Sequence, residues 1–219
     1  MKKYQLSIGQ KQISVYPSTA SAAPIIYLNS VEDTAYSLPN AADASLVVIS
    51  GLDWNAELSP WSSPSIFKGA PPFCRNADQY LEFLLHEIAP KAEALLPHPI
   101  SWRGLAGYSM AGLFAVYALY QTDFFTRIAS VSGSLWFPGI REYVLSQKMK
   151  TRPDRIYFSL GDKEHKTRNA AMRPVRENTE AIEGFYRKTG IHTIFETNSG
   201  NHFTDPTERT EKGLSWLLR

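Results

Sequence analysis

Apolar residues recur with a period of two, or in unbroken runs, over the first half of the chain, and this pattern is typical of β-strands. The strands it predicts lie at 4–8, 12–16, 24–29 and 45–51. The last of them reads SLVVISG and is almost wholly apolar, as expected for a strand buried on both faces of a mostly parallel sheet.

After residue 76 the period switches repeatedly between that of a helix and that of a strand. The first predicted helix begins with a capping box at Asn76 and Gln79 and has a kink at Pro90. The alternation predicts a three-layer α/β fold, in which a mostly parallel central sheet carries helices on both faces. We expect a single domain over 1–219, without a large cap domain. The predicted helices are 77–96, 111–121, 140–147, 175–190 and a last one from 206, and the predicted strands between them are 101–107, 127–134, 155–161 and 192–197.

One segment, 53–75, is too long for an ordinary connection between elements. It holds four prolines, two tryptophans and two phenylalanines. Loops beyond about 12–15 residues are usually functional or disordered, and the aromatic content argues against disorder. We therefore expect an ordered loop that packs over one end of the sheet.

Composition and charge exclude several classes of protein. Lys and Arg number 23 against 21 Asp and Glu, and the basic residues are scattered, so no nucleic-acid partner is expected. No apolar run approaches the roughly 20 residues of a membrane-spanning helix, and the N-terminus lacks the apolar block of a signal peptide. The single Cys74 cannot form an internal disulfide. We expect a cytoplasmic protein without a membrane partner, and the oligomeric state is not predictable from the sequence.

The stretch GYSMAGL at 107–113 places Ser109 between a predicted strand and a predicted helix. Such a strand, turn and helix expose a nucleophilic serine at the carboxyl end of the strand, provided that the neighbouring residues are small. Gly107, Ala111 and Gly112 meet this requirement. The Met110 N–H then becomes the first donor of an oxyanion hole. The alternative is a serine that only caps a buried helix.

A nucleophilic serine needs a base and usually an acid, which in this fold follow in the order Ser, Asp/Glu, His. His202 lies in a short turn between the last predicted strand and the last helix, and it is the histidine with the right order and position. Glu164 and Asp162 follow the predicted strand at 155–161. Glu164 is preferred for its offset from the strand end, and Asp162 stays as the alternative acid.

The second oxyanion donor is expected in the loop after the third strand of the sheet. Taking SLVVIS as that strand, the sequence predicts the backbone N–H of Leu52 or Asp53, next to Gly51.

Five ordered motifs, GYSMAGLFA, DWN…SPW, SVSGSLW, SLGDKE and GNHF, together resemble an esterase family of the α/β-hydrolases. Its members include the enterochelin (siderophore) esterases and, more distantly, esterase D and the mycolyl transferases. The resemblance runs from about Ser45 to the C-terminus. It implies a cofactor-free and metal-free serine hydrolase with Ser109 as nucleophile, His202 as base, and Glu164 or Asp162 as acid.

The resemblance also implies that Trp136, in SGSLW, lies near the substrate. With Trp54, Trp61 and Tyr108 it would line an aromatic substrate pocket, although each tryptophan could equally be part of the core. We expect a carboxylic ester hydrolase that forms an acyl-enzyme with siderophore-type or other small esters. The alternatives are an inactive binding protein of the same fold, and an acyltransferase or thioesterase that uses the same triad.

Overall fold

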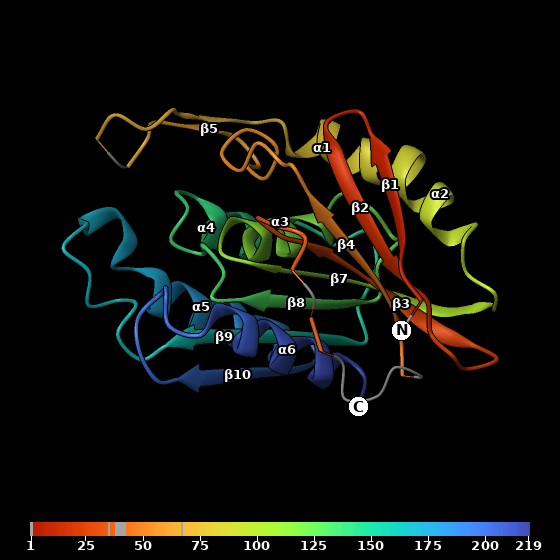
Figure 1. Ribbon diagram of the computed structural model, residues 1–219. Coiled ribbons are helices and arrows are strands. Elements are labelled where there is room, and N and C mark those ends of the chain that lie inside the picture. Colours follow the sequence, from red (N-terminus) through yellow and green to blue (C-terminus); the bar gives the residue numbers. More distant parts are fainter. Residues whose placement is uncertain (1, 35, 38–42, 67) are drawn as a thin grey trace.

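The computed structural model describes residues 2–34, 36–37, 43–66 and 68–219 (Figure 1). The strands are β1 (Tyr4–Ile8), β2 (Lys11–Tyr16), β3 (Ala23–Asn29), β4 (Ser45–Ser50), β5 (Ser62–Ser63), β6 (Phe73–Cys74), β7 (Ile100–Tyr108), β8 (Arg127–Val131), β9 (Arg155–Gly161) and β10 (His192–Asn198). The helices are α1 (Ala77–Phe83), a π-helical turn (Leu84–Ile88), α2 (Ala89–Glu93), α3 (Met110–Ala118), α4 (Ile140–Ser146), a 3₁₀ turn (Ala170–Met172), α5 (Val175–Lys188) and α6 (Pro206–Leu217).

The central sheet has eight strands in the order β1-β2-β4-β3-β7-β8-β9-β10. β2 pairs antiparallel with both β1 and β4, and every later pair is parallel. The carboxyl ends of β3, β7, β8, β9 and β10 therefore meet along one edge of the sheet, where ligands bind in open α/β folds. The predicted α/β fold with a mostly parallel sheet is confirmed.

Helices cover both faces of the sheet, but unequally. One face packs with α1 to α5 into the larger hydrophobic core, which includes Phe114 and Phe158. The other face packs against α6, which contributes Leu214, Trp216 and Leu217. Figure 1 shows α6 in front of the sheet, with α3 and α4 on its far side. α3 is buried along its whole length, because it lies on β7 and β8 and also contacts α1 and α4 through the ring pairs Tyr80–Phe114 and Tyr117–Tyr143.

The first helical segment differs from its prediction in two respects. The Asn76 side chain makes no capping hydrogen bond, so the predicted capping box is wrong. The helix also contains a π-helical turn at Leu84–Ile88, directly before α2, which the sequence did not predict, and the kink at Pro90 stays a prediction. A proline has no N–H to donate to the carbonyl four residues earlier in a helix. A wider π-helical turn accommodates the loss of that hydrogen bond without ending the helix.

The long segment after β4 is ordered wherever the structure describes it, and β5 and β6 form a small antiparallel pair within it. Part of it packs against helices. The Trp61 indole donates to the Pro138 carbonyl at 2.8 Å and contacts the rings of Tyr117 in α3 and Tyr143 in α4. Within the described ranges, none of the helices combines the length and the apolar character needed to cross a membrane.

Candidate active site

Ser109 occupies the sharp turn between β7 and α3 with a strained backbone. Its φ of +58° and ψ of −121° lie outside the usual regions for a residue with a side chain. Only small neighbours allow this turn. A Cβ on Gly107 would lie 2.6 Å from the carbonyl carbon of Ala111, and one on Gly112 would lie 2.9 Å from the Gly133 Cα. The glycines at 107 and 112, which in the sequence indicated a nucleophilic serine, are thus required by the close packing of this turn.

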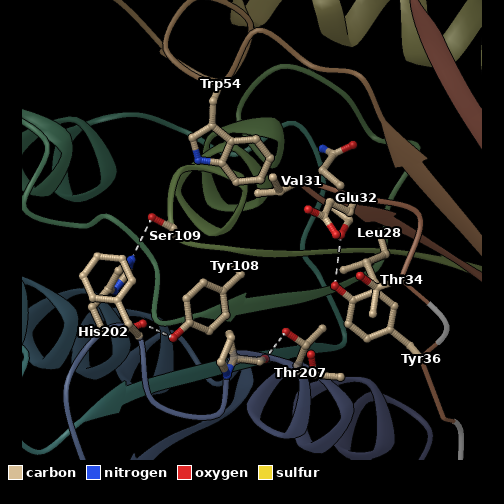
Figure 2. A pocket seen from close by; sticks show the side chains of 15 residues that line it. Leu28, Val31, Glu32, Thr34, Tyr36, Trp54, Tyr108, Ser109, His202 and Thr207 are labelled. Carbon is tan, nitrogen blue, oxygen red and sulfur yellow. Dashed lines mark hydrogen bonds between the residues drawn. The ribbon is translucent and has the colours of Figure 1, made fainter. Parts of the chain in front are cut away.

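A continuous hydrogen-bonded relay connects three side chains from separate loops (Figure 2 shows its serine and histidine). The His202 Nε2 lies 3.0 Å from the Ser109 Oγ, and its Nδ1 lies 2.8 Å from the Glu164 Oε2. The ionised carboxylate accepts a hydrogen bond from the Nδ1–H, so Nε2 carries no proton and can accept that of the serine hydroxyl. A second hydroxyl, that of Ser134, lies 3.2 Å from the Ser109 Oγ.

Glu164 is almost fully buried, and its other carboxylate oxygen is held by several donors. Oε1 accepts hydrogen bonds from the Gly161 N–H at 2.6 Å, the Ser132 hydroxyl at 2.8 Å and the Arg209 guanidinium at 3.1 Å. Burial by itself would raise the pKa of this carboxyl. The hydrogen bond and charge of His202, the Gly161 N–H and the Ser132 hydroxyl outweigh burial and hold its pKa below the usual value. Glu164 is thus kept ionised.

Asp162 lies in a different position from Glu164. Its Oδ1 accepts the Gly200 N–H at 2.7 Å, which ties the end of β9 to the loop that carries His202. Tyr108 fixes the same loop, because its hydroxyl donates to the His202 carbonyl at 2.6 Å. Burial, mainly, and the charge of Glu164 raise the pKa of Tyr108, so this phenol stays protonated and able to donate.

Arg209 is a buried residue of the site that the sequence analysis missed. Its guanidinium contacts the Glu164 Oε1, donates to the Ser199 carbonyl at 2.7 Å and lies 3.2 Å from the Ser132 hydroxyl. It stands in α6 within the charged stretch TERTEK, where nothing distinguishes it from a solvated arginine. Its burial follows from the packing of α6 on β8 and β9.

A cavity of about 400 Å³ opens beside the serine. In Figure 2, Ser109 and His202 lie at one side of it, Val31, Glu32 and Tyr36 at the other, Trp54 above and Thr207 below. Trp54 and Tyr108, two of the four residues predicted to bind substrate, line this cavity.

The other two tryptophans lie elsewhere. Trp61 packs on α3 and α4 as described above, and Trp136 is buried in contact with the rings of Phe73 and Phe137. Neither lines the cavity beside Ser109, so both fit the core role that was left open for them.

The two predicted oxyanion donors have different outcomes. The Met110 N–H is at the first position of α3, where no helical carbonyl can accept it. The prediction of Leu52 or Asp53 rests on a wrong strand count. SLVVIS is β4, the fourth strand, and β3 lies between it and β7 in the sheet. The Asp53 N–H is moreover held by the Glu57 carboxylate at 2.7 Å.

The loop that follows β3, the strand next to β7, contributes Ser30, Val31, Glu32 and Thr34 to the cavity wall. The part of the chain that the structure describes holds no cluster of three or more His, Cys, Asp or Glu placed to bind a metal ion.

A family model described as "Putative esterase" matches residues 25–204, and the chain belongs to this family. Membership of this family defines the chain as a carboxylic ester hydrolase. Among curated proteins, the uncharacterized protein YbbA of Bacillus subtilis (strain 168) is 22% identical over 190 residues, which cover 80% of this chain and 76% of that protein.

Solved structures of the same fold include several esterases. The siderophore hydrolase EstB from Aspergillus nidulans has a TM-score of 0.74 at 18% identity, over 99% of this chain and 94% of that one. An IroE-like serine hydrolase from Shewanella oneidensis has a TM-score of 0.78 at 17% identity, over 99% of this chain and 79% of that one. The enterobactin esterase FES from Shigella flexneri has a TM-score of 0.68 at 17% identity, and the match spans 99% of this chain and 58% of that one.

Proposed function

We propose that this protein hydrolyses small carboxylic esters through an acyl-enzyme on Ser109, with His202 as base and Glu164 as acid. The observation that carries the proposal is the relay of 3.0 Å and 2.8 Å contacts from the Ser109 Oγ through His202 to Glu164, at the wall of a cavity. A serine hydroxyl is a poor nucleophile until a base accepts its proton, and this arrangement supplies that base.

The reaction proceeds in two halves. In the first, the Ser109 Oγ attacks the ester carbonyl carbon while His202 Nε2 takes the hydroxyl proton. Nε2 then returns this proton to the departing alkoxide, so that the alcohol leaves and the acyl group stays on the serine. In the second half, water loses a proton to Nε2 and attacks the acyl carbon, and the same proton restores the serine hydroxyl as the carboxylic acid departs. Throughout, Glu164 stays ionised and orients and stabilises the imidazolium.

The tetrahedral oxyanion of each half is stabilised by two backbone donors. The first is the Met110 N–H, at the positive end of α3. The second is an N–H of Val31 or Glu32, because their loop follows β3 and lines the cavity together with Ser109. The Ser30 N–H is unsuitable because it donates to the Ile49 carbonyl at 2.8 Å.

The test is hydrolysis of p-nitrophenyl butyrate by the unchanged protein and by Ser109→Ala, with folding of both checked by circular dichroism. Because triad members act as a unit, kcat should fall by roughly 10³- to 10⁶-fold. Ser101→Ala is the matched control, since Ser101 is exposed near the other end of β7 and should change nothing. Equal activity of Ser109→Ala and the unchanged protein, or absence of Ser109 labelling by a fluorophosphonate, would refute the proposal.

Siderophore esters are the first natural substrates to screen. EstB is described as a siderophore hydrolase and FES as an enterobactin esterase, and both share this fold. Release of the free acid from such esters, lost in Ser109→Ala, would extend the proposal to that substrate class.

A further inference from the structure

The cavity beside Ser109 has an unusual charge balance. Its fifteen lining residues include neither Lys nor Arg, and Glu32 supplies their one carboxylate. The residues outside the described ranges do not change this balance, because the sequence has no charged side chain at 1, 35, 38–42 or 67. Among the described residues of the wall, Glu32 is therefore the only Asp, Glu, Lys or Arg.

The carboxylate of the next residue, Asp33, is not available to a ligand in the cavity. Asp33 does not line the cavity, and its Oδ2 accepts hydrogen bonds from Lys3 at 2.7 Å and from Gln5 at 3.3 Å. Glu32 makes no ion pair in the described structure and is exposed. Its negative charge thus acts on whatever enters the cavity.

Aromatic rings form much of the remaining wall. Trp54, Tyr108, Tyr36 and Phe203 all line the cavity. Phe203 is 85% exposed although it is a large apolar residue, and its ring stands edge-on to the His202 ring at a centroid distance of 5.3 Å. The faces of aromatic rings carry negative potential and attract cations, and aromatic cages are the usual binding sites of quaternary ammonium groups.

From these two features we infer that the cavity selects esters that carry a cationic group, an ammonium or a quaternary ammonium, in the portion that occupies it. The inference rests on the proposed ester hydrolysis and adds its substrate class. The anionic counterpart of such an ester is disfavoured, since no basic side chain of the wall would compensate its charge.

The expected selectivity is moderate because Glu32 is exposed to water. A unit charge about 6 Å away in a water-like dielectric favours a cation over its neutral isostere about threefold. A cation–π contact at an exposed site adds a further factor of roughly two to five. We therefore expect a cationic ester to exceed its neutral isostere in kcat/KM by about six- to fifteenfold, and an anionic ester to fall below the neutral one.

The experiment compares two matched sets of esters at low ionic strength. In the first set the acyl group varies: p-nitrophenyl esters of one chain length end in a trimethylammonium, a tert-butyl or a carboxylate group. In the second set the alcohol varies: butyrates of choline, of 3,3-dimethylbutanol and of a carboxylate-bearing alcohol are followed by acid release. Both sets are run with the unchanged protein, Glu32→Gln and Asp33→Asn.

The inference is supported if the cationic ester leads in either set, if Glu32→Gln reduces this lead about threefold, and if Asp33→Asn leaves it unchanged. It is overturned if the neutral or anionic ester is preferred in both sets, or if Glu32→Gln and Asp33→Asn have equal effects. Failure of the proposed hydrolysis has a different signature, because then the neutral esters too are not turned over in a Ser109-dependent manner. A lead that disappears in 1 M salt would further identify charge as its cause.

Discussion

Replacement of Arg209 by methionine tests whether this buried guanidinium holds the acid of the relay in position. Arg209 is 2% exposed and contacts Glu164, Ser132 and the Ser199 carbonyl, so it joins the acid to the loop that leads to His202. Methionine keeps an unbranched apolar stem but can neither donate a hydrogen bond nor carry charge. The change removes the positive charge that compensates the buried Glu164 carboxylate and the hydrogen-bond donor of the Ser199 carbonyl.

The magnitude follows from the burial of this ion pair. Removing one partner of a buried pair costs about 3–5 kcal/mol, because the other charge stays desolvated. For a chain of this length each kcal/mol shifts Tm by about 2–4 °C, so Tm should fall by roughly 6–20 °C. Since a misplacement of about 1 Å in a catalytic group can cost about 100-fold, kcat/KM should fall about 10- to 100-fold.

The decisive assay is the pH profile of kcat/KM for p-nitrophenyl butyrate. Without the nearby cation, Glu164 stabilises the imidazolium of His202 more strongly, so the acid limb of the profile should move to higher pH. Arg209→Lys, which keeps the charge, should restore the position of this limb at least partly. The matched control is Lys212→Met on the same helix, because Lys212 is exposed and its 3.0 Å ion pair with Glu208 contributes less than about 1 kcal/mol.

The reasoning is refuted if Arg209→Met keeps the Tm, the kcat/KM and the acid limb of the unchanged protein. A loss of Tm with an unmoved acid limb in Arg209→Met and Arg209→Lys would show that Arg209 supports the fold without positioning Glu164.

Three further predictions concern the acid and the turn. Glu164→Gln should lower kcat for p-nitrophenyl butyrate by about 10³-fold or more, whereas Asp162→Asn should cost less than about tenfold; equal effects would show that the wrong acid was chosen. The pKa of Glu164 is lowered on folding, so its contribution to stability is present above the unfolded value of about 4.5 and is lost as pH falls through the folded value; urea unfolding of Glu164→Gln should accordingly depend less on pH in this acidic range than that of the unchanged protein. Gly107→Ala should destabilise by about 1–3 kcal/mol in urea unfolding, because its Cβ would overlap Ala111, whereas Gly184→Ala, with no atom within 4 Å of the new Cβ, should not destabilise.

Much of the fold could be predicted because local periodicity reports burial directly. The run SLVVIS predicts a strand buried on both sides, and all six residues of β4 are buried. The amphipathic pattern of Val175, Ile182 and Tyr186 predicts α5 in the same way, and these residues face the core. The detail of helix termini was less predictable, as at Asn76, because a capping hydrogen bond depends on side-chain geometry as well as on residue type.

In the candidate site, too, the local features were predictable from the sequence and the contacts between distant segments were not. The strained turn at Ser109 was predictable, because a strand, small residues and a helix in succession are local features. Four facts depended on strands and loops distant in the sequence. These are the contact of Glu164 rather than Asp162 with the imidazole, the burial of Arg209 beneath it, the packing of Trp61 and Trp136 away from the cavity, and the position of β3 next to β7.

The sequence by itself therefore determined the succession of strands and helices, the turn that exposes Ser109, and the order in which acid and base follow it. Periodicity and residue size act between near neighbours, so they can be read along one chain. Only the tertiary structure decided which strands pair, and with them which of two carboxylates two residues apart faces His202. A side chain's partners depend on the order of strands in the sheet, and that order is set by burial summed over the whole core rather than by any local pattern.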